Sequence, residues 1–146
     1  MQKNIELLNK AKNLHKKGQV EKAIKIYLEL INKKKNNIEL IFLLGTAYLQ
    51  INNLENSLLH LNNTIKLDKY FFRAYNNRAI VHNKMGENLK AIEDCEIALK
   101  IKPNFNDSLI NKGIALKSLK RFDEAINCFK KSLLINPIIS ETYNNI

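Results

Sequence analysis

Apolar and small residues recur along this chain with a period of 34 residues. Four consecutive repeats, aligned under one another, carry similar residue types in the same columns: residues 4–37, 38–71, 72–105 and 106–139. Near the start of each repeat, positions 4, 8 and 11 hold mostly apolar or small side chains. Together with position 7 they form the i, i+3, i+4, i+7 stripe of an α-helix. A fixed period of this length predicts stacked supersecondary units.

A small residue occupies position 8 of every repeat, which predicts that a second helix packs closely against the first one there. The four residues are Ala11, Gly45, Ala79 and Gly113. Later in each repeat, position 20 is again small, and position 24 holds a larger side chain. The four residues at position 24 are Tyr27, Leu61, Cys95 and Phe129. Because small and large side chains on facing helices can interlock, we expect each repeat to form a helix hairpin.

Turn residues lie where such hairpins need them. Position 15, just past the first helix, is occupied by Gly18, Asn52, Gly86 and Lys120. Glycine and, less readily, asparagine adopt the left-handed conformation that ends many helices, so Lys120 departs from the pattern. Pro103 and Pro137 fall at position 32, where they cannot continue the second helix. The first two repeats carry weaker stop signals.

These columns resemble the tetratricopeptide repeat family over nearly the whole chain. The best matching segments are GENLKAIEDCEIALKIKP at residues 86–103 and RFDEAINCFKKSLLINP at residues 121–137. The resemblance implies an all-α fold, a right-handed superhelical solenoid of antiparallel helix hairpins. It predicts a single solenoid over residues 1–146, in which residues 140–146 form a partial fifth repeat or a capping helix. In this family the first helices line a concave face that binds ligands.

Positions 2, 6, 9 and 13 of each first helix lie opposite the predicted packing stripe. The resemblance places them on the concave face, which is polar and mildly basic with scattered apolar side chains. The candidate peptide-binding residues on this face are Asn9, Lys12, Lys16, Thr46, Gln50, Arg73, Asn77, Ile80, Lys84, Asn111, Ile114 and Asn145.

Asparagine recurs at position 6 within this face. The column reads Asn9, Leu43, Asn77, Asn111 and, in the partial fifth repeat, Asn145. An amide both donates and accepts, so a file of amides can pair with successive peptide groups of an extended ligand. The column is similar to the asparagine ladder in the superhelix that precedes the catalytic domain of protein O-linked N-acetylglucosamine transferases. The alternative is chance, because the chain holds 22 asparagines in 146 residues.

A second ligand class known in the family is the C-terminal carboxylate of chaperones, which a clamp of lysine, arginine and asparagine side chains holds. The residues at the matching places are Leu8, Lys12, Leu43, Arg73 and Asn77. Only Arg73 keeps the charge that its place requires, so the sequence argues against the clamp.

The net charge of +10 raises the question of a nucleic-acid partner. The first repeat carries nine lysines against three acidic residues, so much of the excess lies in one hairpin and its loop rather than along a continuous track. Helical repeats that read RNA use base-specific side chains in register, and the chain shows no such code. RNA binding is therefore the less favoured alternative.

Residues for catalysis or metal binding are missing from the pattern. Cys95 and Cys128 lie on successive second helices, where a free cysteine acts as a small apolar side chain. His82 falls in a packing column, and neither His15 nor His60 has partners at a metal-ligand spacing. We therefore predict no enzyme activity and no cofactor. Neither a signal peptide nor a membrane span is expected, and the cytoplasm is the predicted compartment.

The C-terminal residues begin a unit that the chain does not complete. Ser140 can cap a new helix, and Tyr143 and Ile146 fall in packing columns. We expect a longer native protein, and self-association through this edge is possible. The function predicted is a non-catalytic protein–protein interaction module that binds an extended peptide or a partner protein in the concave groove. The alternative is a substrate-recruiting N-terminal arm of a larger enzyme such as a glycosyltransferase.

Overall fold

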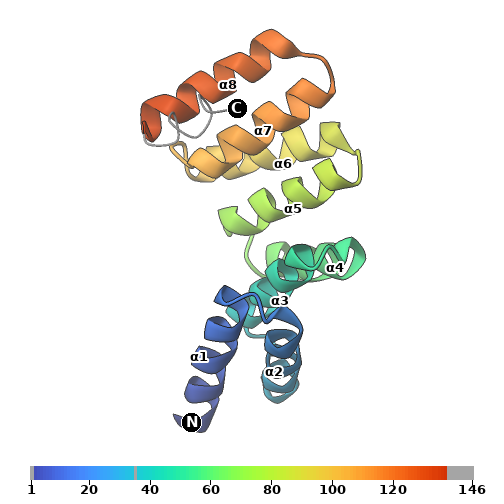
Figure 1. The fold of residues 1–146 in the computed structure, drawn as a ribbon, viewed down its shortest axis with the longest axis vertical. Helices are drawn as coiled ribbons and strands as arrows, with labels where there is room; N and C mark the ends of the chain where they lie inside the picture. The colour runs from blue at the N-terminus through green and yellow to red at the C-terminus, as the bar shows by residue number, and fades with distance from the viewer. Residues whose placement is uncertain (1, 35, 138–146) are drawn as a thin grey trace. The chain divides into compact units, whose positions relative to one another are not determined.

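The computed structural model describes residues 2–34 and 36–137, and all regular structure within these ranges is α-helical (Figure 1). The helices are α1 (Gln2–Lys16), α2 (Val20–Lys33), α3 (Ile38–Gln50), α4 (Leu54–Leu67), α5 (Phe72–Lys84), α6 (Asn88–Ile101), α7 (Asn106–Ser118) and α8 (Phe122–Ile135). Each odd-numbered helix pairs with the next even-numbered one as a hairpin. The predicted all-α hairpin fold is confirmed.

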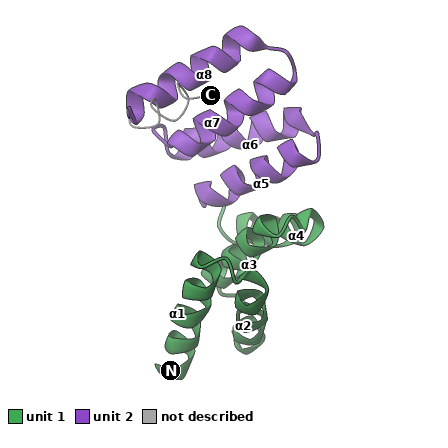
Figure 2. Ribbon diagram, in the orientation of Figure 1, with its two compact units in different colours: residues 1–69 green, residues 70–146 purple. Residues whose placement is uncertain are grey.

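The chain divides into two compact units, residues 1–69 and residues 70–146 (Figure 2). Unit 1 holds the hairpins α1–α2 and α3–α4, and α2 packs on α3. Unit 2 holds α5–α6 and α7–α8, with α6 packed on α7. That residues 1–146 form a single solenoid stays a prediction. The proposed partial fifth repeat, with Tyr143, Asn145 and Ile146, lies outside the described residues.

Helix boundaries follow the 34-residue period closely. The helices α3, α5 and α7 begin at the first position of their repeats, and every second helix spans positions 17 to 30. The helices α6 and α8 end two residues before Pro103 and Pro137, as predicted. However, α2 and α4 end at the same position of their repeats without a proline there. In α4 the stop lies at Asp68, whose backbone is already extended at φ −140° and ψ 104°.

Position 15 adopts a left-handed backbone in all four hairpins. The φ angles are +79° at Gly18, +58° at Asn52, +77° at Gly86 and +60° at Lys120. Lys120 therefore departs from the pattern in residue type only, and its backbone carries the strain that a side chain adds in this region. In the same turn, the amide of Arg121 donates to the carbonyl of Leu116 at 2.9 Å, so the hairpin geometry requires this conformation.

We expect opposite changes in stability from Gly86→Ala and Lys120→Gly. No atom lies within 4 Å of a Cβ placed on Gly86, so its replacement adds backbone strain alone. It should lower the free energy of unfolding by about 1 kcal/mol, and Lys120→Gly should raise it by a similar amount. Urea unfolding followed by circular dichroism measures both, with Lys120→Ala as the control for loss of the lysine side chain. A glycine variant no more stable than that alanine variant would contradict the argument.

The core of unit 1 lies between α1, α2 and α3. Its buried members are Ala11, Val20, Ala23, Ile24, Tyr27, Leu30, Leu40, Leu44 and Ala47. In the neighbouring hairpin, Gly45 of α3 faces Leu61 of α4: a Cβ added to Gly45 would lie 3.0 Å from Leu61 Cγ. The predicted close approach at position 8 is confirmed here.

The core of unit 2 lies between α5, α6, α7 and α8. Its buried members are Ala79, Ala91, Ile92, Cys95, Ala115, Leu116, Ala125 and Cys128. Gly113 of α7 repeats the contact seen in unit 1, because a Cβ added there would lie 2.5 Å from a ring carbon of Phe129. Position 24 of the second helix therefore packs on position 8 of the first helix in both units, as the columns predict.

The first helices have a second buried face that the sequence analysis missed. Positions 3 and 10 hold buried residues in α3, α5 and α7: Leu40, Ala47, Ala74, Val81, Ser108 and Ala115. Within unit 1, Leu40 and Ala47 pack in the same core as residues of α2, the second helix of the preceding hairpin. In α1 these positions are Glu6 and Asn13, and both are exposed. Position 7, assigned to the packing stripe, is buried only at Leu44.

Candidate peptide-binding surface

In unit 1 the candidate residues all keep some exposure to solvent. Asn9, Lys16 and Gln50 are exposed, and Lys12 and Thr46 are half-buried. Three of the five already have partners. Lys12 on α1 forms an ion pair with Glu39 on α3, the Thr46 hydroxyl donates to the carbonyl of Phe42 at 3.0 Å, and Gln50 is hydrogen-bonded to His15.

In unit 2 the candidates lie on α5 and α7. Arg73, Lys84 and Ile114 are exposed. Asn77, Ile80 and Asn111 are half-buried. The structure thus brings two amides and two isoleucines to the surface of neighbouring first helices, which gives a ligand both hydrogen-bonding groups and apolar contacts. The last candidate, Asn145, lies outside the described residues.

A buried amide network joins α5 to α7. The Oδ1 atom of Asn76 accepts from the Ser108 hydroxyl and from Asn111 Nδ2, both at 2.9 Å. Its Nδ2 donates to Asn77 Oδ1 at 3.4 Å, and Asn83 Nδ2 donates to the backbone carbonyl of Asn111 at 3.2 Å. Asn76 is 4% exposed. Its hydrogen bonds therefore hold the side chains of Asn77 and Asn111 from beneath the surface.

Sequence reasoning missed Asn76 because it occupies position 5, which was assigned to neither the packing stripe nor the concave face. The other residues in that column are Leu8, Phe42 and Ile110. An asparagine at an otherwise apolar position was the available signal. Because Asn111 donates to Asn76, it is both a surface residue and a link between α5 and α7. Position 6 of one first helix lies beside position 5 of the preceding first helix. In unit 1 the residues that correspond to Asn76 and Asn111 are Leu8 and Leu43, and both pack against the core.

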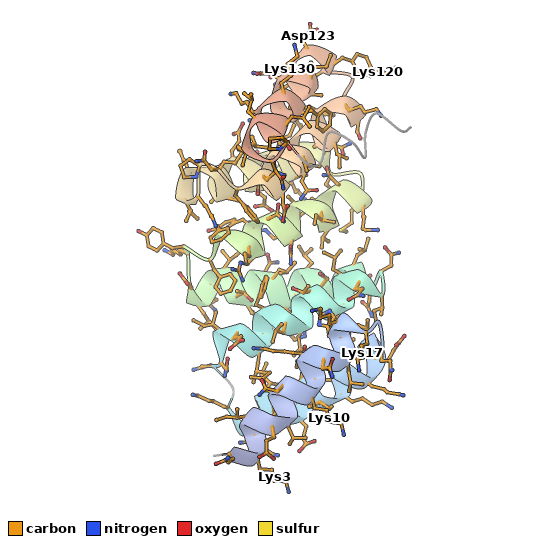
Figure 3. All side chains as sticks on the ribbon, turned by 60° about the vertical axis from the view of Figure 1, so that its left-hand side comes forward. Lys3, Lys10, Lys17, Lys120, Asp123 and Lys130 are labelled. Carbon is orange, nitrogen blue, oxygen red and sulfur yellow. The ribbon has the colours of Figure 1, made fainter. Side chains whose placement is uncertain are left out.

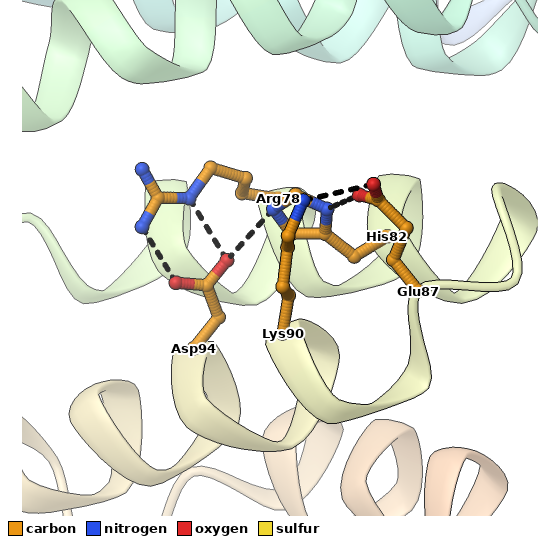
Figure 4. A network of polar contacts seen from close by, with 5 residues as sticks. All are labelled: Arg78, His82, Glu87, Lys90 and Asp94. Atoms are coloured by element: carbon orange, nitrogen blue, oxygen red, sulfur yellow. Dashed lines mark hydrogen bonds and ion pairs between the residues drawn. The ribbon is translucent and has the colours of Figure 1, made fainter.

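A second polar network links α5 to α6 (Figure 4). Arg78 makes a bidentate ion pair with Asp94, with Nε to Oδ2 at 2.8 Å and Nη2 to Oδ1 at 2.6 Å. His82 Nδ1 lies 2.6 Å from Glu87 Oε2, and its Nε2 lies 3.7 Å from Asp94 Oδ2. Lys90 donates to the other oxygen of Glu87 at 2.8 Å.

Electrostatics within this network stabilise its charged forms. The hydrogen bond to Asp94 raises the pKa of Arg78. The ammonium group of Lys90 and, to a lesser extent, His82 lower the pKa of Glu87. Asp94 and Glu87 thus already pair with Arg78 and Lys90 of the same hairpin. The Arg78–Asp94 pair holds α5 to α6. The packing role predicted for His82 is confirmed, since it is 8% exposed, but its two carboxylate neighbours were not foreseen.

Both cysteines are buried and free, as predicted. Burial raises the pKa of Cys95 to about 12 and also raises that of Cys128, so both stay as neutral thiols. His15 and His60 are partly buried, and burial lowers the pKa of each. His60 stacks on Tyr48 with ring centroids 5.5 Å apart. Across residues 2–34 and 36–137, no group of three or more metal-ligating side chains comes together.

Basic side chains are spread along the first hairpin. Figure 3 shows Lys3 and Lys10 along α1 and Lys17 just past its end, each seven residues from the next. Lys12 pairs with Glu39 and Lys33 pairs with Glu29, so acidic residues neutralise part of the excess. In the part of the chain that the structure describes, no helix is both long enough and apolar enough to cross a lipid bilayer.

Comparison with known proteins identifies the repeats. The model of the tetratricopeptide repeat matches residues 72–105 and 107–138. Among relatives, the chain is 26% identical to the BBSome complex member BBS4 of Bos taurus over 84% of this chain and 24% of that protein. It is 25% identical to Hsp70-Hsp90 organizing protein 3 of Arabidopsis thaliana over 64% of this chain and 17% of that protein.

A third relative is the serine/threonine-protein phosphatase 5 of Rattus norvegicus, 29% identical over 83% of this chain and 25% of that protein. The chain thus spans a quarter or less of the length of these three relatives. Among solved structures, a crystal structure of MamA superposes with a TM-score of 0.81 at 28% identity, covering 92% of this chain and 79% of MamA.

These comparisons agree with the geometry of the hairpins. The matched repeats and the relatives support a protein–protein interaction module as the general role of the chain. The likeness to an interaction fold of this kind favours a non-enzymatic role, although one relative is a phosphatase. The matched repeats show that residues 72–105 and 107–138 belong to the tetratricopeptide repeat family, and the left-handed turn at position 15 is shared by all four hairpins.

Proposed function

We propose that the chain is a non-catalytic module that binds an extended segment of a partner protein on the exposed faces of its first helices. In unit 2 the binding groups are the amides of Asn77 and Asn111 with the side chains of Ile80 and Ile114. An extended peptide offers alternating N–H and C=O groups, which amides can pair with whatever the ligand's sequence.

The observation that carries this proposal is the buried network around Asn76. Its bonds to Asn77 and Asn111 orient both surface amides before any ligand arrives. Fixed side chains lose less conformational entropy on binding than mobile ones, so a network of this kind favours affinity. Asn111 uses one amide N–H for Asn76, and an amide has two such donors as well as acceptor capacity. The network is therefore compatible with a ligand on the same face.

The chaperone clamp receives no support from unit 1. Two of its places hold Leu8 and Leu43, which pack against the core. A third holds Lys12, which pairs with Glu39. The similarity to an Hsp70-Hsp90 organizing protein therefore supports a protein partner in general, and the residues at the surface favour recognition of the peptide backbone over capture of a terminal carboxylate.

Asn77→Ala tests the proposal. Ligand peptides would first be selected from a displayed library of disordered protein segments, and their affinities measured by fluorescence polarisation. Asn77→Ala should weaken binding by roughly twofold to tenfold, the usual effect of losing one hydrogen bond. The matched control is Asn127→Ala, an exposed asparagine on α8 away from this face. Thermal unfolding of each variant separates lost contacts from lost structure.

Equal affinities for the Asn77→Ala and Asn127→Ala proteins would rule out amide recognition. Asn111→Ala is less suitable for this purpose, because it removes a donor 2.9 Å from the buried Asn76, whereas the bond that Asn77 accepts from Asn76 is longer, at 3.4 Å. We expect it to lower stability as well as affinity.

A second candidate function follows from the phosphatase relative, in which the matched stretch accounts for 25% of the protein. By that analogy the chain would be a substrate-recruiting arm of a larger enzyme, with a glycosyltransferase as the example suggested by the asparagine column. The peptide surface would be the same in both cases. Peptides selected by the module would then also be substrates of the enzyme, whereas an independent adaptor would show no such overlap.

A further inference from the structure

Unit 1 contains an open hollow of about 340 Å³ where the start of α1 meets the end of α2 and the start of α3. Its apolar lining comes from Ile5, Leu8, Leu30 and Leu40. Leu30 and Leu40 are each 4% exposed and form part of the core, whereas Ile5 is 56% exposed. The hollow uses none of the candidate residues of the peptide-binding surface.

At the equivalent repeat positions, unit 2 carries two aromatic rings. Phe72 and Phe105 occupy positions 1 and 34 of the third repeat, and their rings meet edge to face with centroids 4.8 Å apart. The ammonium group of Lys102, at position 31, lies 5.0 Å from the Phe72 ring centroid and 5.9 Å from that of Phe105. A cation at this distance is attracted to the ring face.

Unit 1 lacks the rings at these positions, and its apolar lining residues replace the polar or small side chains of Arg73, Asn76, Ala98 and Ser108 in unit 2. Positions 1 and 34 of the first repeat are Asn4 and Asn37, and both line the hollow. Position 31 is Lys34, the counterpart of Lys102, and it lines the hollow as well. Positions 1 and 34 thus carry two short amides in unit 1 and two phenylalanines in unit 2, whereas the lysine at position 31 is present in both.

We propose that this hollow binds an aromatic side chain of a partner protein, carried on a segment with carboxylates beside the aromatic residue. The ring would lie beside the positions that correspond to Phe72 and Phe105, under the lysine at position 31. Its apolar floor, formed by Ile5, Leu8, Leu30 and Leu40, is particular to unit 1. The volume is sufficient, since a buried apolar cavity of about 150 Å³ accommodates benzene.

Charge around the hollow selects the flanking residues of the partner. Lys33 and Lys34 both line it. Glu29 neutralises part of the charge of Lys33 through an ion pair at 2.8 Å. The first repeat as a whole carries nine lysines against three acidic residues. Acidic residues next to the aromatic ring would gain attraction here, and basic ones would be repelled.

The test uses a fluorescein-labelled peptide of sequence GDEFDEG with the full chain. We expect saturable binding that weakens as salt rises, and much weaker binding of two control peptides, GDEGDEG and GKQFKQG. Asn4→Phe introduces the ring found at position 1 of the third repeat, so it should fill the hollow and weaken binding by about tenfold or more. Asn4→Gln, which adds no ring, should leave binding unchanged.

Lys34→Glu should weaken binding by about tenfold, because it removes a cation from the ring and places a carboxylate beside the ligand's acids. Lys10→Glu makes the same change in charge on α1, at a residue that does not line the hollow, and should have a much smaller effect. Asn77→Ala should have none, which distinguishes this site from the peptide-binding surface. Equal binding of the GDEGDEG peptide, or unchanged affinity in the Asn4→Phe protein, would overturn the proposal.

Discussion

Arg78→Ala should destabilise unit 2 by about 3–5 kcal/mol, the range measured when one partner of a buried ion pair is removed. The Asp94 side chain is 5% exposed and that of Arg78 is 21% exposed, so water screens the pair only weakly. Without the guanidinium group, the carboxylate would stay buried and would keep His82 at 3.7 Å as a neighbour. Urea unfolding at neutral pH, followed by circular dichroism, measures the loss.

Two further variants decide whether the stranded charge is the cause. Arg78→Met combined with Asp94→Leu removes both charges and keeps the volume, so it should recover most of the stability. Arg121→Ala breaks an exposed ion pair with Glu124 in the same unit and should change stability little. If the double replacement were as unstable as Arg78→Ala, packing rather than charge would explain the loss.

Leu61→Ala should lower the free energy of unfolding by about 2–5 kcal/mol, because it leaves a cavity in the hairpin of α3 and α4. Leu61 is fully buried, and its side chain packs directly on Gly45. Leu59→Ala is the matched control: Leu59 lies on the same helix, but it is 54% exposed. Urea unfolding should show little change for that variant.

The effect of Gly45→Ala should change sign with the residue at position 61. In the natural chain the new Cβ would lie 3.0 Å from Leu61 Cγ and 3.3 Å from its backbone nitrogen, so the helices must separate. In the Leu61→Ala background the contact with the side chain is gone and the 3.3 Å contact with the backbone nitrogen remains, which a shift of a few tenths of an ångström relieves. The helical preference of alanine then adds about 1 kcal/mol. Gly45→Ala should then stabilise the protein. An equal effect in both backgrounds would show that the two positions do not interact.

The columns predicted this hairpin contact because helix packing leaves a local mark on the sequence. A residue pressed against a neighbouring helix must be small, and the side chain that presses on it fills the remaining space. Gly45 with Leu61 and Gly113 with Phe129 both follow this rule. The turns at Gly18 and Gly86 also leave a local mark on the sequence, because a left-handed backbone favours glycine.

The candidate surface was predicted less completely. Each candidate within the described residues keeps some exposure. However, the helical periodicity of one first helix did not reveal that its positions 3 and 10 are also buried in α3, α5 and α7. Nor did it show that Asn111 reaches across to Asn76 of the preceding first helix. Lys120 gives a similar lesson, because its left-handed φ of +60° comes from the hairpin around it rather than from its own preference.

The sequence by itself determined the 34-residue period, the helix hairpins and the faces on which they pack, because these depend on residue size and polarity at fixed spacings. Only the tertiary structure decided which polar side chains meet. The bonds of Asn76 to Ser108 and Asn111 and the Arg78–Asp94 pair join residues 16 to 35 positions apart in the chain. The hollow in unit 1 likewise depends on three helices meeting, since Asn4, Lys34 and Asn37 define a site only when they lie around one space. Contacts of this kind depend on where helices cross and not on the periodicity of any single helix.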